Sequence, residues 1–422
     1  MMPARDDGGV SLEAAAGGVG LFSLLQPIVA LPDAEVVGYE ALARWPSPGV
    51  DPAAVFAHAA RTGRLDTLDR SCIGAAIESG VRAGVPNGAM LAVNCEPNSV
   101  YSGRDDDALL DRAADAFAIV FELTERSLLQ QPAALLAKAA AIRDDGFVVA
   151  LDDVGANAES LALLDVLAPE IVKLDWQLIQ RHTRRHQSQT LAAILAYHER
   201  TGAVILAEGI ETVEHLERAM AVGATLGQGY LYGHPHSPTP AEVAAIRPRP
   251  MPLSGHHFGW PTPAESPRSP FDLLSTDWTR TVRTARKEVL TAFSRHIERQ
   301  AADIVDPAMI LTALQHGHNL TPATRHRYER LAVTAPLVAI LGHDVGPRPA
   351  PGVRGVDLDS ADPLCLEWTV VTLGPRTASA LIAREHDPGA DPRDDDRLFD
   401  FVLTYDRTLV AAVTRLLLAR IH

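Results

Sequence analysis

The chain has 422 residues, which is more than one hydrophobic core usually serves, so two domains are the default expectation. Its composition, with 47% hydrophobic and 22% charged residues, is that of a soluble globular protein. The 53 acidic and 38 basic side chains give a formal net charge of −15, which argues against a nucleic-acid polymer or an anionic membrane surface as partner. A small anionic substrate is compatible with this net charge if metal ions or a few arginines bind it.

The cysteines and the N-terminal sequence indicate the cellular compartment in which we expect the protein. Cys72, Cys95 and Cys365 are an odd number without CxxC spacing, so they predict neither a disulfide framework nor a zinc site. The opening sequence MMPARDDGG is acidic where a secretory signal would be basic, and no apolar run reaches the length of a membrane span. We therefore expect a cytoplasmic protein. Residues 1–19, rich in Gly, Ala and Asp, are predicted to form a flexible leader, with order beginning at Leu21.

Ordered structure is expected to start with a β-hairpin. Two β-like runs, 21–31 and 35–44, are separated by the turn sequence Pro32-Asp33-Ala34. The second run carries Glu40 and Arg44 near its end. Taken alone, this pair would most simply be a surface ion pair.

Helical and β-like segments then alternate as far as residue 246. Helices are predicted at 52–61, 65–83, 106–116, 132–144, 188–201, 214–222 and 240–246, and strands at 90–93, 118–121, 147–151, 170–173, 203–206 and near Leu226. Such an alternation predicts an α/β protein with a (β/α)8 barrel of the TIM type. In that fold the C-terminal ends of the strands converge on one mouth, where the chemistry is located.

The strand at 147–151 is followed directly by Asp152 and Asp153. A single aspartate at this place would most simply cap the next helix or turn. Two adjacent carboxylates repel each other, by about 4 kcal/mol for unit charges 4 Å apart at an effective dielectric of ~20. A bound cation would relieve this repulsion, so the pair is a candidate metal site.

Polar residues also follow the other strands. Those expected at the barrel mouth are Glu40, Asn94, Glu122, Asp152, Asp153 and Glu208, with Lys173 as the basic residue among them. Because these ligands are oxygen atoms and include no His or Cys, they suit Mg²⁺ or Mn²⁺ better than zinc. Two ions are expected, since the adjacent aspartates could bridge a pair.

Six short motifs occur in order along this half of the chain. They are EAL at 40–42 within YEALAR, ELTE at 122–125, the pair Asp152-Asp153, KLD at 173–175, AEGIET at 207–212 and GQGYLYG at 227–233. Together they resemble the EAL family of cyclic di-GMP phosphodiesterases, and Gln26-Pro27-Ile28 is similar to that family's opening strand. The resemblance implies a modified barrel whose first strand runs antiparallel, and hydrolysis of cyclic di-GMP to linear pGpG.

The resemblance also implies roles for individual residues. One metal ion would be held by Glu40, Asn94, Glu122 and Asp152, and the second by Asp152, Asp153 and Glu208. Glu208 would also orient or deprotonate the attacking water, Lys173 would hold that water or the phosphate, and Gln228 would contact the substrate or a metal-bound water. Arg44 would bind a phosphate, and the nucleotide pocket would be lined by Gln26, Leu42, Asp175, Glu211 and Pro235. Glu125 would steady the loop after Asp153, and the family would predict a homodimer.

The sequence departs from the family pattern in the loop after the two aspartates. The usual DDFGTGYSSL is here DDVGANAESL, with Val154 for Phe, Ala156-Asn157 for Thr-Gly and Ala158-Glu159 for Tyr-Ser. In the family this loop couples the second metal ion to the dimer interface. Two functions therefore stay open: a metal-dependent phosphodiesterase regulated by its C-terminal domain, and a catalytically silent cyclic di-GMP receptor that signals through that domain.

The remainder of the chain is predicted to form a separate domain. Residues 235–270 hold ten of the 30 prolines, so a semi-rigid linker is expected at 249–269, between a barrel at 20–248 and a domain at 270–422. In that domain helices are predicted at 271–299, 323–335, 378–385 and 406–421, and strands at 337–341, 366–373 and 398–404, which makes it α+β.

Three stretches of this α+β domain, LEWTVVTLGP, RYERLA and FDFVLTYDRTLV, resemble the DICT sensory domain. This implies a ligand or protein partner of unknown identity. Trp368, Tyr405 and Asp406 are tempting ligand contacts, but the aromatic residues are more simply explained as core, and Asp406 as a helix cap, so no site is assigned.

Overall fold

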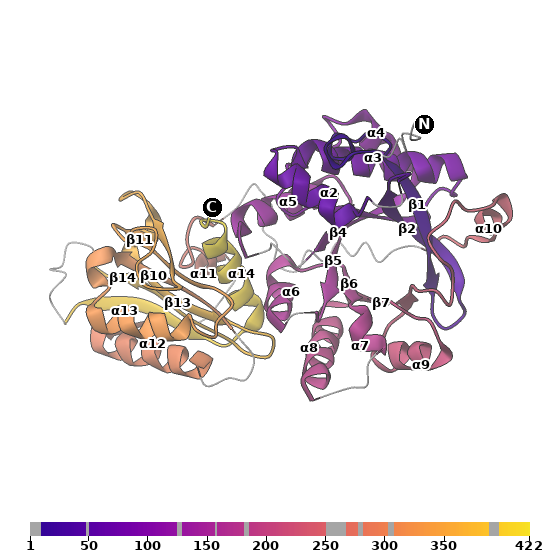
Figure 1. Cartoon of the computed structure of the whole chain (residues 1–422). Helices are drawn as coiled ribbons and strands as arrows, with labels where there is room; N and C mark the ends of the chain where they lie inside the picture. Colours follow the sequence, from indigo (N-terminus) through magenta and orange to yellow (C-terminus); the bar gives the residue numbers. More distant parts are fainter. Residues whose placement is uncertain are drawn as a thin grey trace, which may run out of the picture. The chain divides into compact units, whose positions relative to one another are not determined.

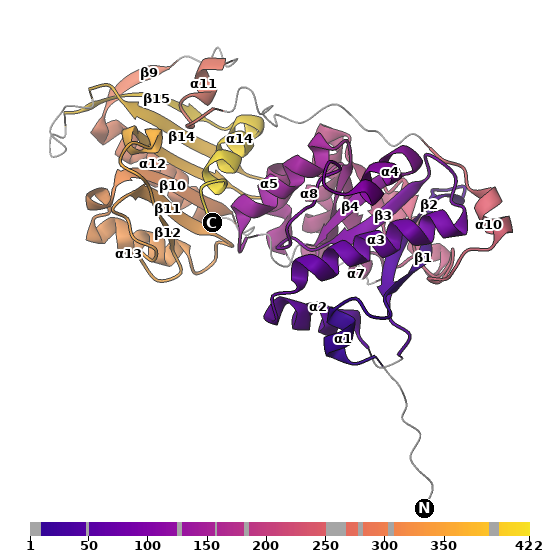
Figure 2. The same cartoon turned by 90° about the horizontal axis from the view of Figure 1, so that it is seen from above.

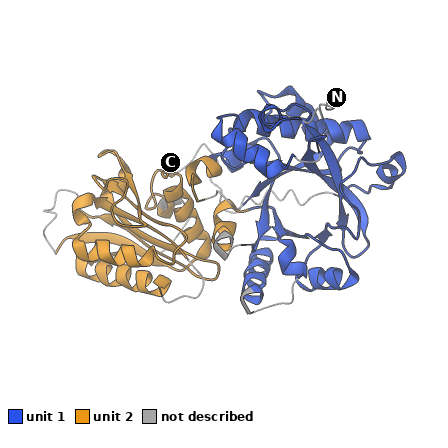
Figure 3. Cartoon of the chain, viewed as in Figure 1, with its two compact units in different colours: residues 1–128, 137–156, 169–254 blue, residues 129–136, 157–168, 255–422 orange. Residues whose placement is uncertain are grey.

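The protein, seen here as a computed structural model, divides into two compact units (Figure 3). The structure describes residues 10–47, 50–124, 129–156, 158–180, 185–249, 267–276, 282–302, 308–387 and 396–422. Unit 1 comprises residues 1–128, 137–156 and 169–254, and unit 2 comprises residues 129–136, 157–168 and 255–422. Two short segments of the first half of the chain therefore belong to the second unit.

Eight strands close into a barrel in unit 1, in chain order (Figure 1). They are β1 (Phe22–Ala30), β2 (Glu35–Arg44), β3 (Met90–Cys95), β4 (Ala118–Thr124), β5 (Val148–Val154), β6 (Ile171–Leu174), β7 (Val204–Ala207) and β8 (Leu226–Gly227). Strand β1 is antiparallel to both neighbours, β2 and β8, and the other neighbouring strands are parallel. The predicted modified barrel with an antiparallel first strand is confirmed.

Helices follow the strands as the periodicity predicts. They are α2 (Pro52–Arg61), α3 (Leu65–Ala83), α4 (Ala108–Ala116), α5 (Pro132–Asp144), α7 (Trp176–Gln180), α8 (Arg185–Thr201), α9 (Val213–Ala221) and α10 (Pro240–Ala245). Several begin at strong local signals. Asp51 caps α2 with Pro52 in its first turn, and Thr239 forms a capping box with Glu242 at the start of α10.

The predicted flexible leader is wrong for its second half. Helix α1 (Leu12–Ala16) begins after Ser11, whose side chain accepts a hydrogen bond from the Ala14 N–H. Ala15 and Ala16 are fully buried in a cluster with Trp45. Small alanine side chains pack closely without giving the large apolar residues that a periodicity search needs, which explains the error. Residues 1–9 lie outside the described residues.

Small and β-branched residues fill the part of the barrel interior that lies away from the C-terminal ends of the parallel strands. This core includes Ala30, Ala92, Val120, Ala150 and Ile171. Strands β2 and β3 approach closely at Gly38, where a Cβ atom would lie 2.1 Å from the Met90 carbonyl oxygen. Gly38 therefore fixes the position of β2, which carries Glu40 two residues later.

Unit 2 contains a seven-stranded mixed sheet in the order β12-β11-β10-β13-β14-β15-β9 (Figure 2). The strands are β9 (Arg283–Arg286), β10 (Met309–His316), β11 (Val338–His343), β12 (Arg354–Asp357), β13 (Glu367–Leu373), β14 (Ala378–Glu385) and β15 (Leu398–Thr404). The helices with it are α6 (Leu164–Leu167), α11 (Leu273–Thr276), α12 (Lys287–Ala302), α13 (Pro322–Leu331) and α14 (Arg407–Leu418). The predicted α+β class is confirmed.

Two helix predictions in this unit are wrong. Residues 378–385 form β14, a central strand that is buried on both faces, so its sequence ASALIARE has no polar alternation and resembles a helix. The helix predicted at 271–299 is interrupted by β9, and α12 starts only at Lys287. Strand β10 was not predicted.

Helices cover this sheet on its two faces. Leu290 and Ile297 of α12 pack with Val370 and Leu381 of the sheet, while α14 packs against β13 and β14. Asp406 caps α14 by accepting hydrogen bonds from the Thr408 and Leu409 N–H groups, as its helix-cap interpretation predicts. Among the helices of the described residues, none combines the length and apolarity that crossing a membrane requires. Most of the predicted linker, residues 250–266, lies outside the described part of the chain.

Candidate metal and substrate site

The ends of the barrel strands bring an acidic cluster around one amine. Lys173, at the end of β6, places its Nζ atom 2.8 Å from Glu122 Oε1, 3.0 Å from Asp152 Oδ1 and 2.8 Å from Glu208 Oε1. Glu40 Oε1 lies 3.8 Å from the same nitrogen. Carboxylates from β2, β4, β5 and the end of β7 therefore meet at one point, as the sequence predicts.

Lys173 is fully buried and charged. Burial alone would lower its pKa, but the surrounding carboxylates of Asp152, Glu122 and Glu208 outweigh this and raise the pKa of Lys173 well above its usual range. One ammonium faces four carboxyl groups, so ionising all four gives the cluster an excess of negative charge. That excess favours the binding of further cations.

A hydrogen-bond network holds Glu40 in place. Its Oε1 accepts from Asn94 Nδ2 at 3.1 Å, and its Oε2 accepts from Gln228 Nε2 at 2.6 Å. Burial works to raise the pKa of Glu40, yet the Lys173 charge and the Gln228 hydrogen bond together lower it. Gln228 Nε2 also reaches Gln26 Oε1 at 3.1 Å, so β1, β2, β3 and the residue after β8 are joined at the mouth.

Glu122 is the most deeply buried of the carboxyl groups around Lys173. Its side chain is fully buried, and its Oε2 has no hydrogen-bond partner among the described residues. Burial and the charge of Glu40 raise the pKa of Glu122 well above its usual range. A buried carboxylate oxygen without a donor is costly, and a metal ion would supply the missing partner.

The two adjacent aspartates lie on a β-bulge. Leu151 pairs with Val172 and Val154 with Leu174, so Asp152 and Asp153 together oppose Lys173 alone. Asp153 has a φ of 55°, in the left-handed region, which turns the two carboxylates away from the regular alternation of a strand. Asp152, Asp153 and Glu208 each offer a ligand oxygen, and these atoms lie within 4.8 Å of one another.

Glu208 is poised to exchange a proton near neutral pH in the metal-free protein. Burial, with the nearby charges of Asp152 and Glu40, raises the pKa of Glu208 to about 8, although Lys173 acts in the opposite direction. The donor set of carboxylate and amide oxygens suits a hard divalent cation such as Mg²⁺ or Mn²⁺. The residues present therefore fit the group that the sequence predicts.

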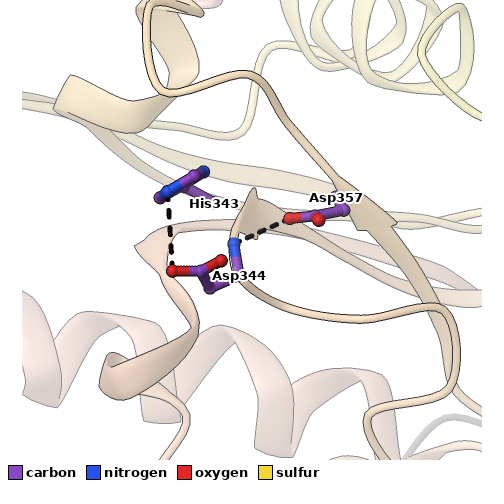
Figure 4. Close-up of side chains that lie close together, drawn as sticks. All are labelled: His343, Asp344 and Asp357. Carbon is purple, nitrogen blue, oxygen red and sulfur yellow. Dashed lines mark hydrogen bonds and ion pairs between the residues drawn. The ribbon is translucent and has the colours of Figure 1, made fainter.

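A second group with metal-ligand spacing occurs in unit 2, formed by His343, Asp344 and Asp357 (Figure 4). His343 Nε2 lies 3.5 Å from Asp344 Oδ2, and the Asp344 N–H donates to Asp357 Oδ1 at 2.7 Å. The Asp344 side chain is 80% exposed. Because exposed carboxylates commonly gather without an ion, we assign no metal site there.

The residues predicted to line a nucleotide pocket are more dispersed. Leu42 and Arg44 border a cavity of about 320 Å³ together with Asn94 and Thr124. Arg44 Nη1 donates to the carbonyl of Ala43 at 2.9 Å. Arg44, the predicted phosphate contact, and Leu42, a predicted pocket residue, thus line the same cavity as Asn94, a predicted metal ligand.

The remaining predicted site residues do not line this cavity or lie outside the described residues. Asp175 is buried and accepts the Gln177 N–H at 2.9 Å, which caps the start of α7. Glu211 is exposed, and Pro235 is half-buried. Glu125 lies outside the described residues, as does Asn157 of the altered loop.

Two glycines that the sequence analysis did not single out position the site. Gly209 has a φ of +67°, and a Cβ atom there would lie 2.6 Å from Trp176 Cβ. A Cβ atom on Gly229 would lie 2.2 Å from the Ile210 carbonyl oxygen. Each glycine adjoins a site residue, Glu208 or Gln228, and their place inside the AEGIET and GQGYLYG motifs is the signal that could have identified them.

Family comparisons agree with this geometry. Residues 11–235 match the model of the EAL domain, and residues 273–386 match that of the sensory domain in diguanylate cyclases and two-component systems. The cyclic di-GMP phosphodiesterase RocR of Pseudomonas aeruginosa is 30% identical over 219 residues, which cover 50% of this chain and 56% of that protein. The probable cyclic di-GMP phosphodiesterase PdeG of Escherichia coli is 28% identical over 221 residues, covering 50% of this chain and 43% of that protein.

Other similar proteins add to this comparison. The uncharacterized protein y4lL of Sinorhizobium fredii is 30% identical over 53% of this chain and 28% of its own length. The structure of Klebsiella pneumoniae BlrP1 in its manganese and cyclic di-GMP complex is 28% identical with a TM-score of 0.46, covering 52% of this chain and 57% of that chain. The chain thus spans less than two thirds of each of these curated relatives. Because the EAL model alone matches more than half of the 422 residues, the chain belongs to the EAL domain family.

Proposed function

We propose that unit 1 hydrolyses cyclic di-GMP to linear pGpG with two divalent cations, Mg²⁺ or Mn²⁺. The observation that carries the proposal is the gathering of four strand-end carboxylates around the buried Lys173 amine. Membership of the EAL family supports the substrate, as do the two relatives named cyclic di-GMP phosphodiesterases.

The cations would be held by two overlapping groups of residues. Asp152, Asp153 and Glu208 would hold one, and Glu40, Asn94, Glu122 and Asp152 would hold the other. When bound, such ions supply Lewis acidity, which lowers the pKa of water and offsets charge on phosphodiester oxygens. The complete burial of Glu122 supports this assignment, because a bound cation would stabilise the ionised form that burial disfavours.

The protein's own groups would move the protons and orient the substrate. Glu208 would accept a proton from the attacking water, whose oxygen bonds to phosphorus while one P–O ester bond of the ring breaks. The Lys173 ammonium would stabilise charge on the phosphate oxygens. The Oε1 atom of Gln228 is buried without a hydrogen-bond partner in the described residues, so it is available to accept one from the substrate.

The other predicted roles are part of the same proposal. Arg44 would bind a phosphate, while Gln26, Leu42, Asp175, Glu211 and Pro235 would line the nucleotide pocket, and Glu125 would steady the loop after Asp153. A homodimer and a cytoplasmic location stay predictions.

Regulation by the C-terminal domain is supported by contacts within unit 2. Strand β5, which carries both aspartates, ends at Val154, and the chain joins unit 2 at residue 157. Asp165 lies 2.6 Å from Arg407 Nη2 at the start of α14, and the side chains of both residues are largely buried. Any movement of α14 would therefore act on a segment covalently close to Asp152 and Asp153.

A second arginine strengthens this link. Arg415 of α14 is buried and donates to two backbone carbonyls of the same segment, that of Asp165 at 2.6 Å and that of Val166 at 2.9 Å. Charge-assisted hydrogen bonds of this kind are among the stronger ones. The sensory domain would thus hold the segment that follows the metal-binding bulge.

A catalytically silent cyclic di-GMP receptor is the second candidate function. It is supported by the altered loop sequence DDVGANAESL, in which the aromatic residues of the family are missing. Such a protein would bind the dinucleotide and pass the signal through unit 2 without turnover.

One experiment separates the two functions. The full chain is incubated with cyclic di-GMP and Mg²⁺ or Mn²⁺, and the products are separated by chromatography, with calorimetry for binding. We expect pGpG from the wild-type protein, none in EDTA, and none from Glu208→Gln. Binding without turnover under every condition would select the receptor, and the absence of both would rule out both functions.

A further inference from the structure

Unit 2 contains a cavity of about 810 Å³ between the helix layer and one end of its sheet. The side chains of Trp368 and Phe399 from the sheet and Tyr328 from α13 form its aromatic wall. Lys287, Thr291, Arg295 and Glu298 contribute from successive turns of α12. The volume lies within the usual range for small-molecule sites, about 300 to 1,000 Å³.

Two residues that line this cavity carry buried hydrogen-bond donors without acceptors. Arg397 is 7% exposed, and its Nη1 donates to Glu385 Oε1 at 3.0 Å, but its buried Nε has no partner in the part of the chain that the structure describes. The same holds for the indole Nε1 of Trp368. Because buried donors are almost always paired in folded proteins, these two atoms indicate that an acceptor from outside the chain belongs here.

The aromatic side chains are held in a fixed arrangement. The Trp368 and Phe399 rings meet edge to face with centroids 6.1 Å apart, and the Arg397 guanidinium lies 5.5 Å from the centroid of the Phe399 ring. The two ring planes are inclined by 75°, so they form an apolar corner beside the two unpaired donors. An apolar part of a ligand can pack into such a corner.

The charges around the cavity favour an anion. Four cationic side chains line it, those of Lys287, Arg295, Arg327 and Arg397, against the single carboxylate of Glu298. Two of the four are paired with carboxylates, Arg327 with Glu298 and Arg397 with Glu385, so the excess of positive charge comes from Lys287 and Arg295. Glu298 is already engaged, since it pairs with Arg327 and accepts hydrogen bonds from the Tyr328 hydroxyl at 2.8 Å and the Ser294 hydroxyl at 3.1 Å. The Glu385 partner of Arg397 is likewise shared, with Gln315 Nε2 at 3.1 Å.

The backbone at the cavity is strained. Gln315, which lines the cavity near the end of β10, has a φ of 65°, and the pairing of β10 with β11 is interrupted between Ala313 and His316. A left-handed conformation is unfavourable for a residue with a long side chain, and such conformations cluster at ligand sites.

We propose that this cavity binds a small molecule with an apolar body and one anionic group, a carboxylate or a phosphate. The anionic group accepts hydrogen bonds from Arg397 Nε and Trp368 Nε1, and the body lies against Trp368 and Phe399. Trp368 is thus part of a binding wall and not only of the core. Binding at this site does not depend on whether the barrel hydrolyses a dinucleotide.

Calorimetry on the full chain tests the site with three probes of similar shape: 2-naphthoate, 2-naphthyl phosphate and the neutral 2-naphthamide. Saturable binding is expected for at least one anion, about tenfold tighter than for the amide, because hydrogen bonds to a charged group are worth at least that factor. The tighter anion identifies carboxylate or phosphate as the favoured group.

Two variants of lining residues test whether the probes bind in this cavity. Trp368→Phe retains an aromatic ring but removes the indole N–H, and Arg295→Glu reverses a charge at an exposed position of the lining. Each is expected to weaken binding about tenfold. Arg330→Glu, an exposed residue of α13 that does not line the cavity, makes the same charge change and should bind as the wild type does. The proposal is overturned if neither anion binds saturably, or if both lining variants, shown to be folded by circular dichroism, bind as tightly as the wild type.

Discussion

The Nζ atom of Lys173, on β6, lies 2.8 Å from Oε1 of Glu208, the residue that follows the neighbouring strand β7. In the metal-free protein this amine is the cation that the surrounding carboxylates share. A divalent ion would compete for the same oxygens, so the stability of the barrel and its affinity for metal are linked.

Replacing the amine should therefore destabilise the barrel. Lys173→Met leaves buried carboxylates without their cation, and we expect the free energy of unfolding in EDTA to fall by about 3–5 kcal/mol. Urea unfolding measures the change. Arg82→Met, which removes a surface pair with Glu78, is the control and should change stability by less than about 1 kcal/mol. A Lys173→Met protein as stable as the wild type in EDTA would contradict this view of the cluster.

The stability of the metal-free protein should also depend on pH. The pKa of Glu208 is about 8 in the folded protein against 4.5 as its ordinary value, so between these values the folded state binds more protons than the unfolded state. Stability contributed by the neutral carboxyl is complete below pH 4.5 and is lost as the pH rises towards 8, by up to about 1.4 kcal/mol per pH unit. The lowered pKa of Glu40 acts in the opposite sense, but only below pH 4.5.

Thermal unfolding in EDTA across pH 5 to 8 checks this dependence. In Glu208→Gln the slope should be smaller, because one titrating group is gone. Saturating Mn²⁺ should raise the melting temperature more at pH 8 than at pH 5, since bound ions require the ionised carboxylates. Equal slopes in the two proteins would show that Glu208 does not titrate in this range.

The packing of β2 on β3 gives a matched pair of glycine substitutions. Gly38→Ala would place its Cβ atom 2.1 Å from the Met90 carbonyl oxygen, so the strand carrying Glu40 must shift, and we expect a loss of about 3 kcal/mol or more. Gly74→Ala, within α3, would bring Cβ 3.6 Å from Leu109, and it should leave stability unchanged or raise it by up to about 1 kcal/mol. Urea unfolding of both variants distinguishes a steric effect from a general cost of losing glycine.

Much of the barrel could be predicted because its signals are local. Helices α2, α3 and α5 begin and end at the predicted residues. Proline opens α2 and α5, and Gly84 in the left-handed conformation ends α3. The site could be predicted because polar residues directly follow apolar strands, and parallel strands bring their ends together.

Other features depend on burial and long-range contacts that no local sequence pattern indicates. Strand β14 was predicted as a helix because burial on both faces removes the alternation of a strand. The pairing of Asp165 with Arg407 joins residues 242 positions apart. Asp165 stands in none of the motifs and Arg407 lies in the stretch FDFVLTYDRTLV, so only the fold shows that the two residues pair.

That pairing predicts a regulatory effect. Asp165→Asn removes the charge opposite Arg407 and should lower the free energy of unfolding by about 3 kcal/mol. If the proposed hydrolysis holds, kcat should fall by about tenfold to hundredfold under conditions where the variant is folded, because the segment after Asp153 is less firmly placed. Steady-state kinetics measures this. Asp396→Asn, which breaks an exposed pair with Arg286, is the matched control and should leave kcat unchanged.

The central claim is that the carboxylates around Lys173 hold divalent cations, and titration with Mn²⁺ followed by electron paramagnetic resonance of the free ion tests it most directly. We predict two bound ions per chain in the wild type, loss of binding in Asp152→Asn, and wild-type binding in Asp357→Asn, which alters the exposed group of unit 2. Absence of Mn²⁺ binding by the wild type, or unchanged binding by Asp152→Asn, would contradict the claim.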